Sequence, residues 1–215
     1  MPSPATSVWT RLYNDLKVSI PGATDAVLQQ ELFRCAKEFF TETNIWTEEI
    51  DMPVVPGTLS YTLTAPAKGA IKRLLLLYNP AQIFPYKSWV NNGIQMQVPG
   101  VVTLTYSPNQ AETWKAVVAK YNSDPTNSAN YPDIDTASQW IVDDYRDAFY
   151  YGTLSYIQFQ PSKPYTNLKQ AAANRQMYIS KRGQARTDAL KANIFGGQRW
   201  VFPQGYATIP RQSGA

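Results

Sequence analysis

The 215-residue chain contains no histidine and only one cysteine, Cys35. Without histidine it lacks the commonest general base and the commonest metal ligand, so every histidine-dependent triad is excluded. A single cysteine can form neither an intramolecular disulfide nor a zinc-binding pair. Cys35 lies at helical spacing from Leu32 and Phe39, which predicts a small buried core residue and fits assembly in a reducing host cytoplasm.

Charge and long apolar runs are also scarce. Charged residues make up 17% of the chain, against about 25% in typical soluble domains. A surface rich in Tyr, Gln, Asn and Thr suggests that much of it contacts other protein. No window approaches the ~18 apolar residues of a membrane span, and the first six residues lack the segments of a signal peptide. We therefore expect a soluble protein without a membrane span, which stays in the cell or leaves it within a particle.

The charge that is present is unevenly distributed. Residues 161–215 carry nine Lys and Arg against Asp188 alone, which gives +8 and leaves −4 for residues 1–160. Within this basic quarter, Lys181, Arg182 and Arg186 span about one and a half helical turns. Two uses remain open for them: contact with an acidic partner or solvent, or contact with the phosphates of double-stranded DNA without sequence specificity.

Helical patterns flank a proline-rich middle. The spacing of Leu28, Leu32 and Phe39 predicts a helix from 24–25 to 42–44, after a weaker helix over 7–18. An apolar stripe from Ile141 to Tyr156 predicts one helix that begins near 136 and ends before Pro161. A final helix is expected over 167–194, stopped at Gly196 and Gly197. One side of it is marked by Leu168, Ala172, Ile179, Arg186 and Leu190.

Between these helices, prolines recur and forbid a long helix. Alternating runs such as Val102, Leu104 and Tyr106 predict five to seven short strands. The predicted fold class is α+β: a helical bundle (1–45 plus 134–196) is interrupted by a β-rich insert (46–133), a sandwich or open barrel. An extended C-terminal arm (197–215) follows.

The acidic cluster Asp143, Asp144 and Asp147 is the one candidate for carboxylate chemistry. Asp143 and Asp147 are four residues apart on one helix face, roughly 6 Å between Cβ atoms. However, Arg146 is a neighbour and the start of a helix favours the ionised form, so a solvated or interface-paired acidic face is the expected reading. No phosphate-binding loop is present. We therefore predict no catalytic residue, no metal ligand and no cofactor.

The arm contains Arg199, Trp200, Phe202 and Tyr206 among Pro, Gly and Gln residues that cannot form a core alone. Aromatic anchors carry much of the energy of protein interfaces. A segment that folds on binding can also bury a large surface. The arm is therefore predicted to dock on a partner protein.

Several segments, taken in order, resemble phage head–tail adaptor proteins, the head–tail connectors similar to tail tubular protein A of short-tailed phages. The first half contributes residues 32–40 (LFRCAKEFF), 46–50 (WTEEI) and 56–63 (PGTLSYTL). The second half contributes residues 140–148 (WIVDDYRDA), 152–154 (GTL), 161–167 (PSKPYTN), 185–186 (AR) and 199–204 (RWVFPQ).

The resemblance implies a ring, typically of twelve copies, that docks beneath the portal protein in the neck of the virion. Such a ring receives the tail nozzle or tail tube protein and lets DNA pass. By this resemblance Arg199, Trp200, Phe202 and Tyr206 belong to a portal-docking arm. Two alternatives stay open: a tail-completion or neck protein of another ring, and a non-specific DNA-binding protein.

Overall fold

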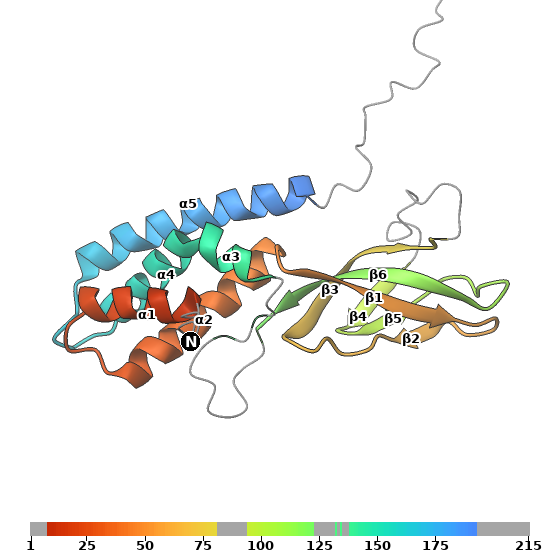
Figure 1. Ribbon diagram of the computed structural model, residues 1–215, viewed down its shortest axis with the longest axis horizontal. Helices are drawn as coiled ribbons and strands as arrows, with labels where there is room; N and C mark the ends of the chain where they lie inside the picture. Colours follow the sequence, from red (N-terminus) through yellow and green to blue (C-terminus); the bar gives the residue numbers. More distant parts are fainter. Residues whose placement is uncertain (1–7, 81–93, 123–131, 133, 135–137, 193–215) are drawn as a thin grey trace, which may run out of the picture.

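The computed structural model describes residues 8–80, 94–122, 132, 134 and 138–192. Over these residues the chain forms five helices and six strands, an α+β fold as the sequence predicts. Figure 1 shows the helices gathered at one end of an elongated molecule and the strands at the other. No described helix is both long enough and apolar enough to cross a membrane.

The first two helices are α1 (Val8–Ser19) and α2 (Asp25–Thr43), close to their predicted bounds. On α2 the buried positions include Leu28, Leu32, Cys35 and Phe39, so the predicted apolar face is confirmed. The helix ends because Asn44 adopts the left-handed conformation (φ 53°) and its N–H bonds the carbonyl of Phe40 at 3.2 Å.

The single helix predicted after residue 136 is wrong: the structure contains two helices, α3 (Gln139–Asp144) and α4 (Arg146–Gln158). They meet at Tyr145, whose backbone leaves the helical region (φ −109°, ψ 25°). The Tyr145 ring packs on Phe39 with ring centroids 5.8 Å apart, and its hydroxyl donates to Asp188 at 3.0 Å. These tertiary contacts accompany the break and could not be deduced from local helical spacing.

The last described helix, α5 (Leu168–Ala192), begins where predicted. Asn167 caps it, because its Oδ1 accepts a hydrogen bond from the backbone N–H of Gln170 at 3.0 Å. Residues 193–196 and the predicted stop at Gly196 and Gly197 lie outside the described residues.

The six described strands agree with the predicted five to seven. They are β1 (Thr47–Val54), β2 (Ser60–Thr62), β3 (Ala70–Tyr78), β4 (Gln95–Val98), β5 (Val101–Thr103) and β6 (Glu112–Tyr121). They form two antiparallel sheets, ordered β1-β6-β3 and β2-β5-β4. Side chains from both sheets share one core, for example Met52, Tyr61, Leu77 and Val102. Within the described residues this is a small sandwich arrangement rather than one barrel.

Trp46 joins the two halves. The sequence places it at the start of the insert, yet its fully buried ring belongs to the core of the helices and packs on Phe40 with centroids 5.2 Å apart. Nζ of Lys120 lies 4.3 Å from the centroid of the same ring, and Lys120 also pairs with Glu48 at 2.6 Å. Gly69 approaches so closely that a Cβ there would lie 2.6 Å from the Trp46 ring.

Candidate functional site

Helix α5 carries the basic positions that the sequence singled out. Its buried face consists of small residues with one large ring and one amide: Ala171, Asn174, Tyr178, Ala185 and Ala189. This face packs against α4 and α2. Alanine side chains let helices approach closely, so α5 gains contact area without large apolar residues on its packing face.

The large apolar residues of α5 point elsewhere. Leu168, Ala172, Ile179, Arg186 and Leu190 share one face, as their spacing predicts, but all five are exposed. Ile179 is 47% exposed and Leu190 is 59% exposed. A helix of a globular protein normally turns its large apolar side chains toward the core. We call these five residues the outer stripe; within the described residues nothing covers it.

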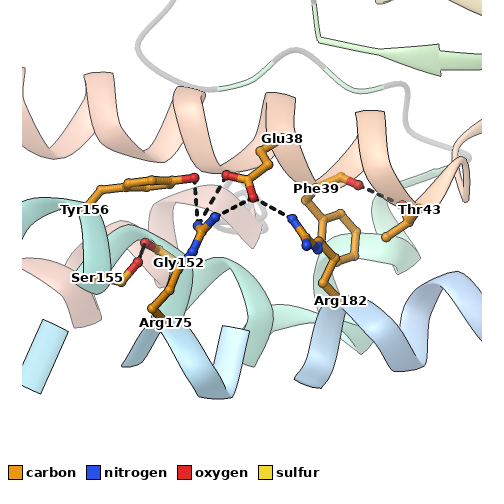
Figure 2. Close-up of polar contacts among 8 residues, drawn as sticks. All are labelled: Glu38, Phe39, Thr43, Gly152, Ser155, Tyr156, Arg175 and Arg182. Carbon is orange, nitrogen blue, oxygen red and sulfur yellow. Dashed lines mark hydrogen bonds and ion pairs between the residues drawn. The ribbon is translucent and has the colours of Figure 1, made fainter. Parts of the chain in front are cut away.

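One flank of α5 is tied to α2 through Glu38, as Figure 2 shows. Arg175 donates from Nη2 to one carboxylate oxygen of Glu38 at 2.9 Å and from Nη1 to the other at 3.3 Å. Arg182 donates to the first oxygen at 2.5 Å. Arg175 also donates to the Tyr156 hydroxyl at 2.9 Å. Glu38 and Arg182 are only 23% exposed, so two guanidinium groups share one carboxylate as counter-charge in a partly dry setting.

The three predicted basic positions of α5 have different surroundings. Arg182 is engaged by Glu38, and its guanidinium lies 5.4 Å from the centroid of the Tyr178 ring. Lys181 faces α4, where its Nζ lies 3.5 Å from a carboxylate oxygen of Asp147. Arg186 is exposed and has no hydrogen bond or ion pair with another described residue. The three side chains therefore do not form one patch.

Helices α2, α4 and α5 pack closely around Gly152. A Cβ on Gly152 of α4 would lie 2.4 Å from Sγ of Cys35 and 2.8 Å from the ring of Tyr178. Burial raises the pKa of the Cys35 thiol to about 12 and also raises the pKa of Tyr178. The buried Cys35 predicted from the sequence is confirmed. A thiol held so firmly protonated is a packing residue, not a nucleophile.

The opposite flank of α5 leads to a second exposed group of residues on α3. Trp140, Asp143 and Asp144 occupy one face of this short helix at i, i+3 and i+4 spacing, and all three are exposed. Asp147, which follows on α4, is 66% exposed beside Lys181. We call Trp140, Asp143 and Asp144 the α3 patch. Its carboxylates are open to solvent.

A cleft also lies in the β-rich half of the molecule. Leu104, Tyr106, Glu112 and Trp114 contribute to its walls. Hydrogen bonds from Gln110, Trp114 and Asn79 hold the pKa of Glu112 below its usual range. A general acid needs the opposite shift. Among the described residues, no group of three His, Cys, Asp or Glu side chains could hold a metal ion.

The sequence prediction and this geometry differ in two respects. The proposed docking residues Arg199, Trp200, Phe202 and Tyr206 lie outside the described residues. The Glu38 network was not predicted, because its partners are 137 and 144 positions apart in the chain. No local pattern signals such a pairing; only the surplus of arginine on α5 hinted at a carboxylate partner.

Comparison with protein-family models and with curated proteins gave no match to this chain.

Proposed function

We propose that this chain is a structural subunit of the head-to-tail adaptor ring of a phage. In this role it docks on the portal protein, joins the tail and lets DNA pass. The observation that carries the proposal is the outer stripe of α5. Exposed apolar side chains grouped on one helix face are typical of surfaces that bind other proteins, and here they precede the residues 193–215 that contain the proposed docking arm.

The arrangement in Figure 1 supports a division of labour. We assign the helices and the arm, with Arg199, Trp200, Phe202 and Tyr206, to the portal and to neighbouring copies in a ring, typically of twelve. We assign the sandwich, at the far end of the molecule, to the tail nozzle or tail tube protein. The ring would form in the host cytoplasm and reside in the neck of the virion.

Contact with passing DNA is a secondary part of the proposal. Lys181 and Arg182 already have carboxylate partners within the chain, which weakens their case. Arg186 is the one of the three without a described partner. Contact through a single exposed arginine would be electrostatic and independent of base sequence.

The proposal is tested by mixing the purified full chain with portal rings. We expect the chain to bind and to form a ring on them, seen by electron microscopy. Truncation after Gly197 should abolish binding while thermal unfolding stays unchanged, because no described core contact is removed. A truncated chain that binds portal as well as the full chain would overturn the docking-arm assignment.

The two alternatives give different results. A tail-completion or neck protein of another ring would be captured by tail proteins and not by portal. A non-specific DNA-binding protein would bind free duplex with a steep dependence on salt. Gel shifts that stay negative at about 50 mM salt would exclude that function, because phosphate contacts are strong under such conditions.

A further inference from the structure

The outer stripe and the α3 patch lie on opposite sides of α5. Arg175 and Arg182 mark the flank that faces α2, and the outer stripe continues from it. Lys181 and Asp188 mark the other flank, through contacts with Asp147 and Tyr145. At 3.6 residues per turn, Asp188 points roughly half a turn away from the outer stripe. The two exposed surfaces thus lie on different sides of α5.

The two surfaces are complementary in chemistry. The outer stripe combines exposed Ile179 and Leu190 with the cation of Arg186, which has no hydrogen bond or ion pair among the described residues. The α3 patch combines Trp140, 49% exposed, with the carboxylates of Asp143 and Asp144. Each surface therefore offers an apolar anchor beside a charge, and the two charges have opposite sign. Tryptophan and arginine are the residues most enriched among those that dominate interface energies.

The same charges disfavour pairing of like surfaces. Two outer stripes placed together would bring two Arg186 guanidinium groups into one interface, and two α3 patches would bring four carboxylates together. Like charges across an interface cost binding energy and suppress the wrong arrangement. The occupant that fits the outer stripe is thus the α3 patch of a second copy.

We propose that the outer stripe of α5 binds the α3 patch of the next copy of this chain in a head-to-tail contact. This inference rests on the proposed ring function and deepens it by naming the two surfaces. A contact between two different surfaces is heterologous, and it continues from copy to copy until a ring closes. The surfaces hold few side chains beside the ~20–30 residues per side of a stable interface. The isolated contact is therefore weak, and rings need the portal as a template.

Site-directed crosslinking of the full chain tests this geometry. Gly183 lies between Ile179 and Arg186 along α5, and a Cβ there would meet nothing within 4 Å. Gly183→Cys and Asp144→Cys therefore place reactive thiols at the two surfaces while Arg186, Trp140 and Asp143 remain. The native Cys35 is fully buried and stays silent. A short bis-maleimide reagent then reports which surfaces meet.

We expect the mixture of Gly183→Cys and Asp144→Cys chains to form crosslinked dimers at least about tenfold faster than either chain alone, the factor expected when like charges replace opposite ones. A chain that carries both cysteines should give a ladder of dimers, trimers and larger products. Gln184→Cys is the matched control, because it is exposed beside Gly183 but points about 100° away around the helix. It should crosslink to Asp144→Cys about tenfold more slowly.

A charge exchange adds a second readout. Arg186→Glu in the Gly183→Cys chain should slow the crosslink, and Asp143→Arg in the partner should restore it. Equal yields for all cysteine positions, or preferred linkage of Gly183→Cys chains to each other, would overturn the inference. If a non-selective amine crosslinker gives ladders that Arg186→Glu leaves unchanged, the ring function survives and only these surfaces are wrong. If no chain gives a ladder with any reagent even when portal rings are present, the ring function itself fails.

Discussion

Arg175 on α5 reaches Glu38 on α2 with both terminal nitrogens of its guanidinium, at 2.9 and 3.3 Å, and so joins two helices that are distant in the sequence. The same carboxylate accepts a hydrogen bond from Arg182. Because Glu38 is the shared acceptor, one carboxylate links two arginines of α5 to α2, in addition to the packing of the buried face of α5. The outer stripe is presented at a fixed angle as a result.

Replacement of Glu38 by glutamine should destabilise the fold. The change leaves two partly buried guanidinium groups without a counter-charge, which costs 3–5 kcal/mol in fully buried pairs. At 23–35% exposure of the three side chains, we expect about 1–3 kcal/mol after allowance for solvent screening. Urea unfolding followed by circular dichroism measures the loss. Glu42→Gln is the control on the same helix, exposed and expected to change stability by less than about 0.5 kcal/mol.

Gly152→Ala and Gly183→Ala should shift stability in opposite directions. Both glycines lie inside helices, where alanine is favoured by up to about 1 kcal/mol. At Gly183 nothing lies within 4 Å of the new Cβ, so the gain is expected in full. At Gly152 the Cβ would collide with Cys35 and Tyr178, and overpacking costs about 1–3 kcal/mol. Thermal unfolding of the two variants compares them directly; a stabilised Gly152→Ala would contradict the close packing of α2, α4 and α5.

Gly69→Ala should weaken the connection between helices and sheets. Gly69 has φ +74°, which an alanine adopts with strain, and its Cβ would lie 2.6 Å from Trp46. Gly57 has a similar φ of +82° but nothing within 4 Å of a Cβ. Gly57→Ala therefore reports the backbone strain alone, about 1 kcal/mol. The expected excess loss at Gly69, measured by urea unfolding, is the cost of displacing the Trp46 ring and the Tyr121 carbonyl; equal losses would show that both give way freely.

The free energy of unfolding should fall in alkali. Burial, followed by the hydrogen bond to Asp188, raises the pKa of Tyr145 to about 12, above its unfolded value near 10. The folded chain thus keeps a proton that the unfolded chain loses, so this contribution is complete below pH 10 and declines as pH rises toward 12. Tyr145→Phe should flatten the fall measured by urea unfolding between these pH values. Tyr106→Phe, at a 77% exposed side chain, should leave the profile as it is.

The thiol of Cys35 should resist modification in the folded chain. Its burial is complete and its pKa is raised to about 12, so almost no thiolate exists near pH 8. We expect maleimide to label Cys35 only after denaturation. Mass spectrometry measures the extent of labelling. Labelling of the folded chain at the rate of a free thiol would show that α2, α4 and α5 separate often, and it would remove the silent background on which the crosslinking test depends.

Local patterns in the sequence were sufficient for most elements. The spacing of Leu28, Leu32 and Phe39 gave the helix and its buried face, because that face packs as a simple amphipathic helix does. The alternation of Val102, Leu104 and Tyr106 predicted a strand only in part: β5 ends at Thr103, Leu104 is buried just beyond it, and Tyr106 is exposed. On α2 the local preference and the tertiary packing agree.

Predictions from the sequence failed where contacts between distant segments determine the local structure. Tyr145 leaves the helix in contact with Phe39 and Asp188, which are 106 and 43 positions away by residue number. On α5, Ala185 and Ala189 are buried while Ile179 and Leu190 are exposed. Residue type alone would predict that Ile179 and Leu190 are buried and that Ala185 and Ala189 are exposed. Small side chains on this face let α5 approach α4 and α2 closely.

The placement of Trp46 has a mechanical consequence. Only Asn44, Ile45 and Trp46 separate the end of α2 from the start of β1, and the Trp46 ring contacts both Phe40 and Lys120. Lys72 of β3 forms a second link, because its Nζ donates hydrogen bonds to the Thr41 carbonyl and to the Asn44 side chain. A pull on the sandwich is therefore transmitted straight into α2 and cannot be absorbed by a slack tether. We therefore expect the helices and the sandwich to move together as one rigid body.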